Sequence, residues 1–293
     1  MKPEKTEFRL HESYVTRLEK LEESDTEDLH HLSVAVNWPH RPLDIEMLFK
    51  LGQGVIARDA IRRPLGTGMS FQYGIDAAMI GMMITHPKLQ AGGLGRNILT
   101  EIEKNIDGRQ LRLNSTRSAW RLYQSAGFRE TGKVIQYQGF TNNSATTVDQ
   151  TNVRLFQSED LSAILALDAL VFGADRSDVI SHLLSNSKAR VICQGTLVSG
   201  FALCRPFGQG YLIGPLVAEF GADAITLASS FIADHAGKFV RLDADSRHQD
   251  LGRFLNQVGL ATYDEIIPMV KGQAYGPERA PDHIYALASQ ALG

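Results

Sequence analysis

A glycine-rich turn is the strongest chemical feature of this 293-residue sequence. The segment 90–96 (QAGGLGR) follows an apolar run and precedes isoleucines at helical spacing. Glycines let the backbone approach a ligand closely, and the free N–H groups at the start of a helix attract negative charge. The turn is therefore predicted to bind an anionic group. It matches neither GxxxxGK(S/T) nor GxGxxG, which excludes a Walker A loop and a Rossmann turn.

Other reactive side chains form weaker patterns. Four arginines, at positions 109, 112, 117 and 121, lie close together without an intervening acid, and a solvated face is favoured over a phosphate contact. Cys193 and Cys204 lie in apolar runs and are expected to be buried thiols, and Asp243, Asp245 and His248 are too few for a metal site. The sequence also lacks GxSxG and HExxH, which disfavours a hydrolase.

The elements that must position the turn are a buried strand at 77–84 and a helix at 94–106. A strand at 111–114, a helix at 119–126 and a strand at 133–140 follow. The polar segment 141–152 (TNNSATTVDQTN) is predicted to be a linker. A similar order of helices and strands recurs after it. We therefore expect two related domains, 1–140 and 153–293, separated by the linker at 141–152.

The composition excludes several classes of protein. Hydrophobic residues make up 43% and charged residues 22%, as in globular proteins, and the net charge is −3. A weak negative charge gives no electrostatic reason to bind nucleic acid or an anionic membrane. The first residues (MKPEKTEFRLHE) are charged, and no apolar run is long enough to span a bilayer. A cytoplasmic protein is expected, and its oligomeric state is left open.

Two motifs in sequence carry a family resemblance. Gln90, Gly93 and Gly95 fill the pattern Arg/Gln-x-x-Gly-x-Gly/Ala, and residues 119–128 (AWRLYQSAGF) fill A-x-x-L-Y-x-x-x-G-F. Together they resemble the GNAT superfamily of N-acetyltransferases. The segments NWPH (37–40), GPLV (214–217), RLD (241–243) and MVKG (269–272) also look like a two-domain bacterial type with a degenerate C-terminal GNAT-like domain.

The resemblance implies an α/β fold made of tandem GNAT folds, each a twisted, mostly antiparallel sheet flanked by helices. It implies acetyl-CoA as the co-substrate, no metal, and transfer of the acetyl group to the amine of a small molecule or, less favoured, of a peptide. Tyr123 would protonate the departing thiolate. Thr116 stands where many members have an asparagine that contacts CoA. The pantetheine and pyrophosphate contacts would come from Met83, Ile84, Gln90, Ala91, Gly92, Gly93, Leu94, Gly95 and Arg96.

The acceptor side is less defined by the sequence. Trp38 and His40 lie in the loop between the first two helices, where the family binds its acceptor, and are expected to contact it. Candidates for the group that takes the proton of the amine are Asp76, His86, His40, Glu46 and a relayed water. An alternative function is a non-catalytic acyl-CoA-binding or regulatory module that keeps the site and acetylates nothing.

The second domain departs from the family pattern. Its equivalent of the glycine turn is Gly221–Ala224, which includes Asp223, an acid that would repel pyrophosphate. Phe254 or Leu255 lies near the position of the tyrosine. We therefore expect no acetyl-CoA turnover in this domain, which instead buries an open face of the first domain or lines the acceptor pocket.

Overall fold

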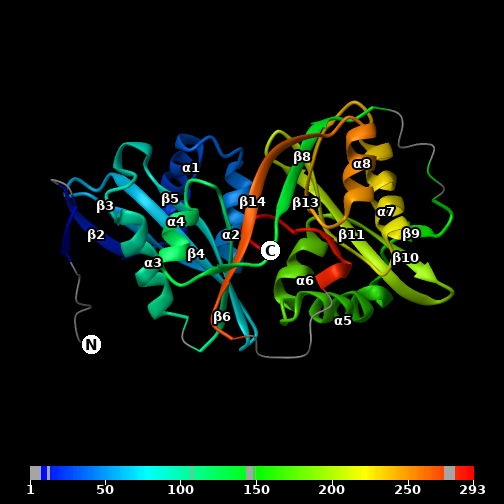
Figure 1. Ribbon diagram of the computed structural model, residues 1–293, viewed down its shortest axis with the longest axis horizontal. Helices are drawn as coiled ribbons and strands as arrows, with labels where there is room; N and C mark the ends of the chain where they lie inside the picture. Colours follow the sequence, from blue (N-terminus) through cyan, green and yellow to red (C-terminus); the bar gives the residue numbers. More distant parts are fainter. Residues whose placement is uncertain (1–7, 12–13, 107, 143–147, 149, 274–280) are drawn as a thin grey trace.

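The computed structural model describes residues 8–11, 14–106, 108–142, 148, 150–273 and 281–293. Its strands pair in the order β1-β2-β3-β4-β5-β6-β14-β8-β13-β15-β12-β11-β10-β9, with β7 beside β14. Figure 1 shows two lobes, with β8 and β14 crossing between them at the centre of the molecule. The expectation of a mixed α/β fold with a mostly antiparallel sheet is confirmed.

The first half of the chain forms the lobe that carries the glycine turn. Its elements are β1 (Phe8–His11), β2 (Tyr14–Lys20), α1 (Thr26–Ala35), α2 (Pro42–Leu51), β3 (Gln53–Arg58), β4 (Pro64–Tyr73), β5 (Ala77–Thr85), α3 (Leu94–Lys104), β6 (Gln110–Ser115), α4 (Trp120–Ser125), β7 (Arg129–Glu130) and β8 (Val134–Phe140).

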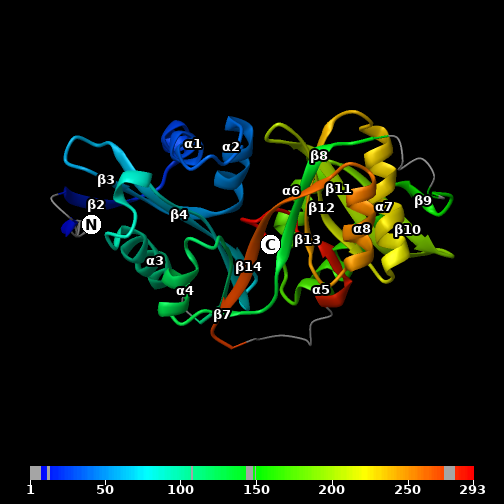
Figure 2. The same cartoon turned by 45° about the horizontal axis from the view of Figure 1, so that its top comes forward.

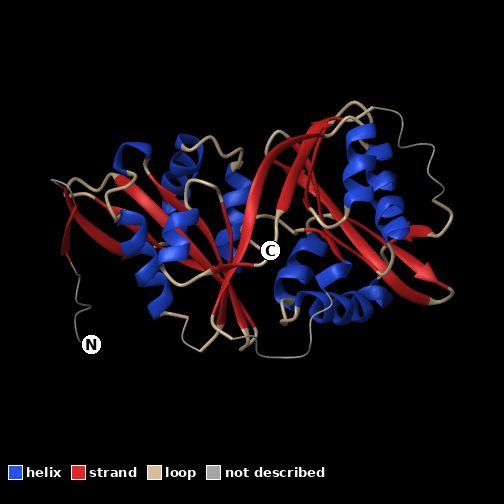
Figure 3. Cartoon of the chain, viewed as in Figure 1, coloured by secondary structure: helices blue, strands red, loops and turns tan. Residues whose placement is uncertain are grey.

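The second half repeats much of this order. Its elements are β9 (Val153–Leu155), α5 (Leu161–Phe172), α6 (Ser177–Ser185), β10 (Lys188–Gln194), β11 (Leu197–Phe207), β12 (Gly210–Ala218), α7 (Gly221–Asp234), β13 (Phe239–Asp245), α8 (Gln249–Gln257), β14 (Ala261–Lys271) and β15 (Ile284–Ala286). Helices cover both faces of the sheet in each lobe (Figures 2 and 3).

Alternating side chains of the strands divide the interior into three apolar clusters. In β5, Met79 packs in a cluster with α1, α2, α5 and α6, whereas Ile80 packs in a second cluster with α3. A third cluster packs α7 and α8 on the sheet of the second half. Because the first cluster contains residues of both halves, the two lobes share part of their core.

Two strands pair across the predicted domain boundary. β8 pairs antiparallel with β13, from Phe140 beside Phe239 to Val134 beside Asp245. β14 pairs antiparallel with β6, from Lys271 beside Leu111 to Ile267 beside Ser115. Each half therefore supplies a strand next to the sheet of the other. The division at 141–152 stays a prediction, and residues 143–147 and 149 of that segment lie outside the described residues.

The last described residues pass between the lobes. Arg176 forms a buried ion pair with Asp168 at 2.8 Å and also donates to the backbone oxygens of Leu292 and Gly293. Arg205 donates to the backbone oxygen of Ala288 at 2.7 Å. These buried arginines hold residues 288–293 at the junction, near the C label in Figure 1.

One expectation about the arginine cluster is wrong. Arg112 is buried, because its guanidinium donates to the backbone oxygens of Phe172 and Gly173 at the C-terminal end of α5. A positive charge is favourable at that end of a helix. Arg117 and Arg121 are exposed, as a solvated face requires.

Candidate functional site

The site begins where two parallel strands separate. β5 pairs with β6 from Ala77 beside Gln110 to Ile80 beside Leu113, and no further pairing of these strands occurs within the described residues. The pairing of β5 with β4 shifts register between Gly81 and Ile84, and Met82 has a φ of 50°. This combination is a β-bulge, which bends the strand away from its neighbour. The second half of β5 therefore presents backbone groups to an open slot.

The glycine turn follows directly after β5. Ala91 and Gly93 have left-handed φ values of 67° and 90°, and α3 starts at Leu94 with no side-chain cap on its first N–H groups. Gln90 Nε2 donates to the backbone oxygen of Thr85 at 3.3 Å, which ties the turn to the strand. The uncapped end of a regular helix supplies free donors and the positive end of its dipole. The turn has the local geometry of an anion site.

Close packing joins this turn to α4. A Cβ atom on Gly95 would lie 3.3 Å from Leu122 Cδ2 and 3.4 Å from Thr85 Oγ1. Arg96 donates to the backbone oxygen of Leu122 at 3.4 Å and to Ser125 Oγ. The guanidinium of Arg96 therefore holds α4 against α3 and keeps the helix that carries Tyr123 in place.

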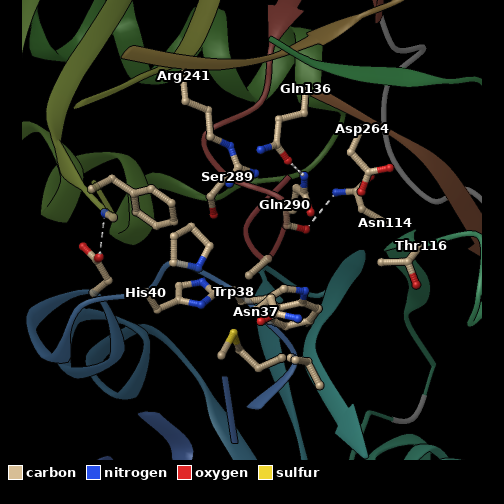
Figure 4. A pocket seen from close by; sticks show the side chains of 18 of the residues that line it. Asn37, Trp38, His40, Asn114, Thr116, Gln136, Arg241, Asp264, Ser289 and Gln290 are labelled. Atoms are coloured by element: carbon tan, nitrogen blue, oxygen red, sulfur yellow. Dashed lines mark hydrogen bonds between the residues drawn. The ribbon is translucent and has the colours of Figure 1, made fainter. Parts of the chain in front are cut away.

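A cavity of about 300 Å³ extends from the slot into the junction between the lobes (Figure 4). On the first-half side it is lined by the α1–α2 loop, the β5 bulge, the end of β6 and α4. On the opposite side it is lined by β8, the β11–β12 turn, β13, β14 and the last residues of the chain. Elements distant in the sequence thus build one pocket.

Tyr123 lies on the wall of this cavity and is only 4% exposed. Its ring makes an edge contact with Phe128, with ring centres 5.9 Å apart. Burial raises the pKa of the phenol above its ordinary value, so the group is protonated at neutral pH. Its hydroxyl has no hydrogen-bond partner among the described residues, which leaves it available to a ligand.

Trp38 and His40 form another part of the wall, with ring centres 5.9 Å apart. His40 Nδ1 forms a 2.8 Å hydrogen bond with Ser33 Oγ, and its ring makes an edge contact with Phe207 of the second half. Burial lowers the pKa of His40 to about 4; the negative charge of Asp44 raises this pKa by a smaller amount, and the positive charge of Arg241 lowers it further. The imidazole is therefore neutral near pH 7.

Carboxamide side chains line the junction between the lobes. Gln290 Nε2 donates to Gln136 Oε1 at 3.1 Å, and Gln136 Nε2 donates to Gln138 Oε1 at 2.7 Å. Asn114 Nδ2 donates to the backbone oxygen of Gln290 at 2.9 Å. Figure 4 shows Gln290 between Gln136 and Asn114, with Trp38 and His40 across the cavity. The chain of bonds fixes the direction of each amide.

The structure brings only part of the predicted site into this cavity. Met83, Thr116, Tyr123, Trp38 and His40 line it, whereas Ile84 and the turn 90–96 lie outside it. Of the candidate bases, His40 is a lining residue. Those that do not line the cavity are Asp76, His86 and Glu46.

Sequence reasoning gave no role to several lining residues. Arg241 appears in the sequence analysis only within the family-like segment RLD, without a role in the site. No role is predicted for the polar lining residues Asn114, Gln136, Gln138, Ser289 and Gln290. The one local signal was the alternation of Arg241 and Asp243 along a strand, which places both side chains on one face.

The counterpart of the slot in the second half is filled. β12 pairs in parallel with β13 at Tyr211 and Leu212, as β5 does with β6. Beyond that point β15 lies between them, with Ala286 beside both Leu216 and Ala244. A Cβ atom on Gly214 would lie 1.9 Å from the backbone oxygen of Leu287, so the filling is tight.

The helix that follows β12 also lacks the features of an anion site. α7 carries Asp223 in its first turn, and burial together with the nearby Glu219 raises the pKa of that acid. Phe254 and Leu255, which lie near the sequence position that corresponds to Tyr123, are both buried in the core. These positions offer neither an uncharged helix start nor a phenol.

The described residues offer neither a metal site nor a membrane-spanning helix. No set of three or more His, Cys, Asp or Glu side chains among the described residues is arranged to hold a metal ion. None of the helices in the described ranges is long and apolar enough to cross a membrane.

Family models for an acetyltransferase (GNAT) domain match the chain twice, at residues 57–142 and 164–286. The curated relative "Uncharacterized N-acetyltransferase YitH" of Bacillus subtilis is 30% identical over 218 residues, which cover 73% of this chain and 76% of the relative. The two family-model matches fall on different halves of the chain, one in each lobe.

Solved structures share the whole architecture. A putative acetyltransferase from Pyrococcus horikoshii has a TM-score of 0.78 at 18% identity, covering 95% of this chain and 96% of its own. A tandem GNAT protein from the clavulanic acid biosynthesis pathway has a TM-score of 0.59 at 12% identity, covering 89% of this chain and 100% of its own. At these identities the likeness concerns the fold, and it extends over both lobes.

Proposed function

The chain belongs to the GNAT acetyltransferase family, and we propose on that basis that it transfers the acetyl group of acetyl-CoA to a primary amine of a small molecule. The observation that carries this proposal is the separation of β5 from β6 after Ile80, which opens into a cavity that reaches Tyr123. A slot of this kind accepts an extended pantetheine arm by strand-like backbone hydrogen bonds.

The residues present fit acetyl-CoA at two places. Backbone groups of Met83 and Ile84 at the bulge would pair with the pantetheine arm, and the N–H groups at the start of α3 would face the pyrophosphate. Thr116 lies at the cavity between these elements and α4. Acetyl-CoA supplies a thioester whose carbonyl carbon can accept an amine nitrogen.

Tyr123 is the proposed general acid. The bond from the amine nitrogen to the acetyl carbon forms as the carbon–sulfur bond breaks, and Tyr123 gives its phenolic proton to the departing sulfur. The buried phenol stays protonated until then because ionisation in this environment is costly. It regains a proton from solvent after the product leaves.

Water is the proposed recipient of the proton that the amine loses. His40 is the candidate base that lines the cavity, but a pKa of about 4 makes its imidazole a weak base near pH 7. The role assigned to Trp38 and His40 is therefore to shape the acceptor pocket.

The test combines calorimetry with a thiol-release assay on the full chain. Acetyl-CoA should bind with one site per chain, and CoA should be released only when an amine from a broad panel is present, with mass spectrometry identifying the acetylated product. Binding without amine-dependent release would support the non-catalytic acyl-CoA module instead. Absence of acetyl-CoA binding would remove both.

A further inference from the structure

The charged side chains that line the junction cavity differ in whether other residues already pair with them. Asp44 is fully engaged, because it accepts from Arg41 at 2.7 and 2.8 Å and from the backbone N–H of Gly208 at 3.2 Å. Asp264 lies at an exposed part of the rim and accepts from the N–H of Glu265. Among the described residues that line the cavity, the one with a permanent positive charge is Arg241 on β13.

Arg241 is held rigidly by its neighbour on the same face of the strand. Its Nε donates to Asp243 Oδ1 at 3.0 Å and its Nη2 donates to Asp243 Oδ2 at 2.8 Å, a bidentate pair. Its guanidinium also lies 5.5 Å from the centre of the Phe207 ring. The side chain of Asp243 is fully buried and that of Arg241 is 9% exposed. The pair therefore fixes the guanidinium in one orientation.

One nitrogen of this guanidinium is left over. Nη1 of Arg241 forms no hydrogen bond with any of the described residues, and Figure 4 shows the side chain directed into the pocket towards Ser289. Arg205, a buried arginine nearby in the fold, has no such free nitrogen at the end of its side chain. Its Nη1 donates to the backbone oxygen of Gly214, and its Nη2 donates to that of Ala288. The free nitrogen of Arg241 thus faces the cavity.

We propose that Nη1 of Arg241 binds a carboxylate of the acceptor, so that the acceptor is an amine that also carries a carboxylate, as an amino acid does. This inference rests on the proposed function and names the substrate class of that same site. A guanidinium is a pure donor with a fixed charge, and its strongest partner is an anionic oxygen. Asp243 acts as a positioning residue, because it orients the guanidinium without touching the acceptor.

The surroundings favour a carboxylate over a phosphate. Asp243 lies directly behind Arg241 and Asp264 lies at the rim, so a doubly charged group would meet two acids with one free donor nitrogen. Ser289 and the ordered amides of Gln136 and Gln138 offer further uncharged hydrogen-bonding groups beside it. The amine at the other end of the acceptor would then extend towards the bulge and Tyr123.

The experiment compares three acceptors that share one side chain: a free amino acid, its primary amide and the amine that lacks the carboxyl group. The native chain should acetylate the amino acid with a kcat/KM higher by roughly tenfold or more than either of the others, as expected for a charge-assisted hydrogen bond. Arg241→Gln/Asp243→Asn should abolish this preference while leaving no unpaired buried charge. Arg241→Lys should retain part of it.

Arg247→Gln is the matched control. Arg247 also pairs with an aspartate two residues away, Asp245, but it does not line the cavity, so the preference should survive its replacement. If no member of the panel is acetylated, calorimetry of the same three compounds in the presence of CoA supplies the readout. A carboxylate preference in binding that the double variant loses would support the inference.

Two results would overturn it. One is equal use or binding of the three compounds by the native chain, and the other is a preference for the amino acid that the double variant retains. They differ from a failure of the proposed function, which would appear as no acetyl-CoA binding or as no CoA release with any amine.

Discussion

The two slots between parallel strands are the most informative comparison in the molecule. In the first half, β5 leaves β6 after Ile80 and the gap opens into the cavity. In the second half, β12 leaves β13 after Leu212 and β15 fills the gap. The two halves thus share one plan, but the chain itself occupies the place in the second half that a cofactor would need.

The two halves of this duplicated fold contribute different parts of the site. In the described part of the second half, β15 fills the slot and Phe254 and Leu255 are buried in the core, yet β13, β14 and residues 289–291 supply the wall of the cavity opposite Tyr123. We therefore assign the chemistry to the first half and the shape of the acceptor site to the second. Variants that act on one half alone can test this division.

The largest expected effect comes from the proposed acid of the first half. Tyr123→Phe should lower kcat by about 100-fold or more, the usual contribution of a general acid, while the affinity for acetyl-CoA changes little. Tyr137→Phe is the control, because Tyr137 packs in the core of the second half and does not line the cavity. Steady-state kinetics with calorimetry measures both. An unchanged kcat in Tyr123→Phe would contradict the role given to the phenol.

The second effect is acid sensitivity at the contact between the halves. The folded-state pKa of His40 is about 4, against an ordinary 6.5, so the unfolded chain takes up this proton at a higher pH than the folded chain. The stability linked to His40 is fully present above pH 6.5 and is lost as the pH falls towards 4. After allowance for partial exposure, the loss is about 2 kcal/mol.

Urea unfolding of the native chain and of His40→Gln between pH 7 and pH 4 measures this loss. The decrease in unfolding free energy over that range should be smaller in the variant by about the same 2 kcal/mol. His31→Gln is the control, since His31 is exposed on α1. Parallel pH profiles of His40→Gln and the native chain would show that the imidazole is not the titrating group.

Local patterns in the sequence predict the elements around the first slot, but they do not predict the strand that fills the second. The strand 77–84, the glycine turn and α3 follow from apolar spacing and from glycines, which act over a few residues. β15 is a three-residue strand without a periodic pattern, and its place depends on pairing with β12 and β13, far away in the chain. Nothing near Ile284 in the sequence indicates these partners.

Long-range contacts also limit what the sequence predicts about the residues that line the acceptor side of the cavity. Trp38 and Tyr123 could be predicted as site residues because each lies in a short family-like motif, NWPH at 37–40 and AWRLYQSAGF at 119–128. The role of Arg241 depends on its one free nitrogen, on its contact with Phe207 and on a cavity that it shares with Gln290. Both of these residues are far from Arg241 in the sequence. Arg112 was misjudged for the same reason, since its partners at the end of α5 lie 60 and 61 residues away.

The smallest expected effect tests the helix starts that follow the two slots. Arg96 and Asp223 both occupy the third position of their helices, α3 and α7. Arg96→Asp should weaken acetyl-CoA binding about tenfold, because an acid beside the free N–H groups opposes a phosphate, and Arg96→Gln should weaken it less. Asp223→Arg gives α7 the favourable charge but leaves β15 in the slot, so calorimetry should still find one site per chain. A second site in Asp223→Arg would mean that charge, and not the filling strand, keeps acetyl-CoA out of the second half.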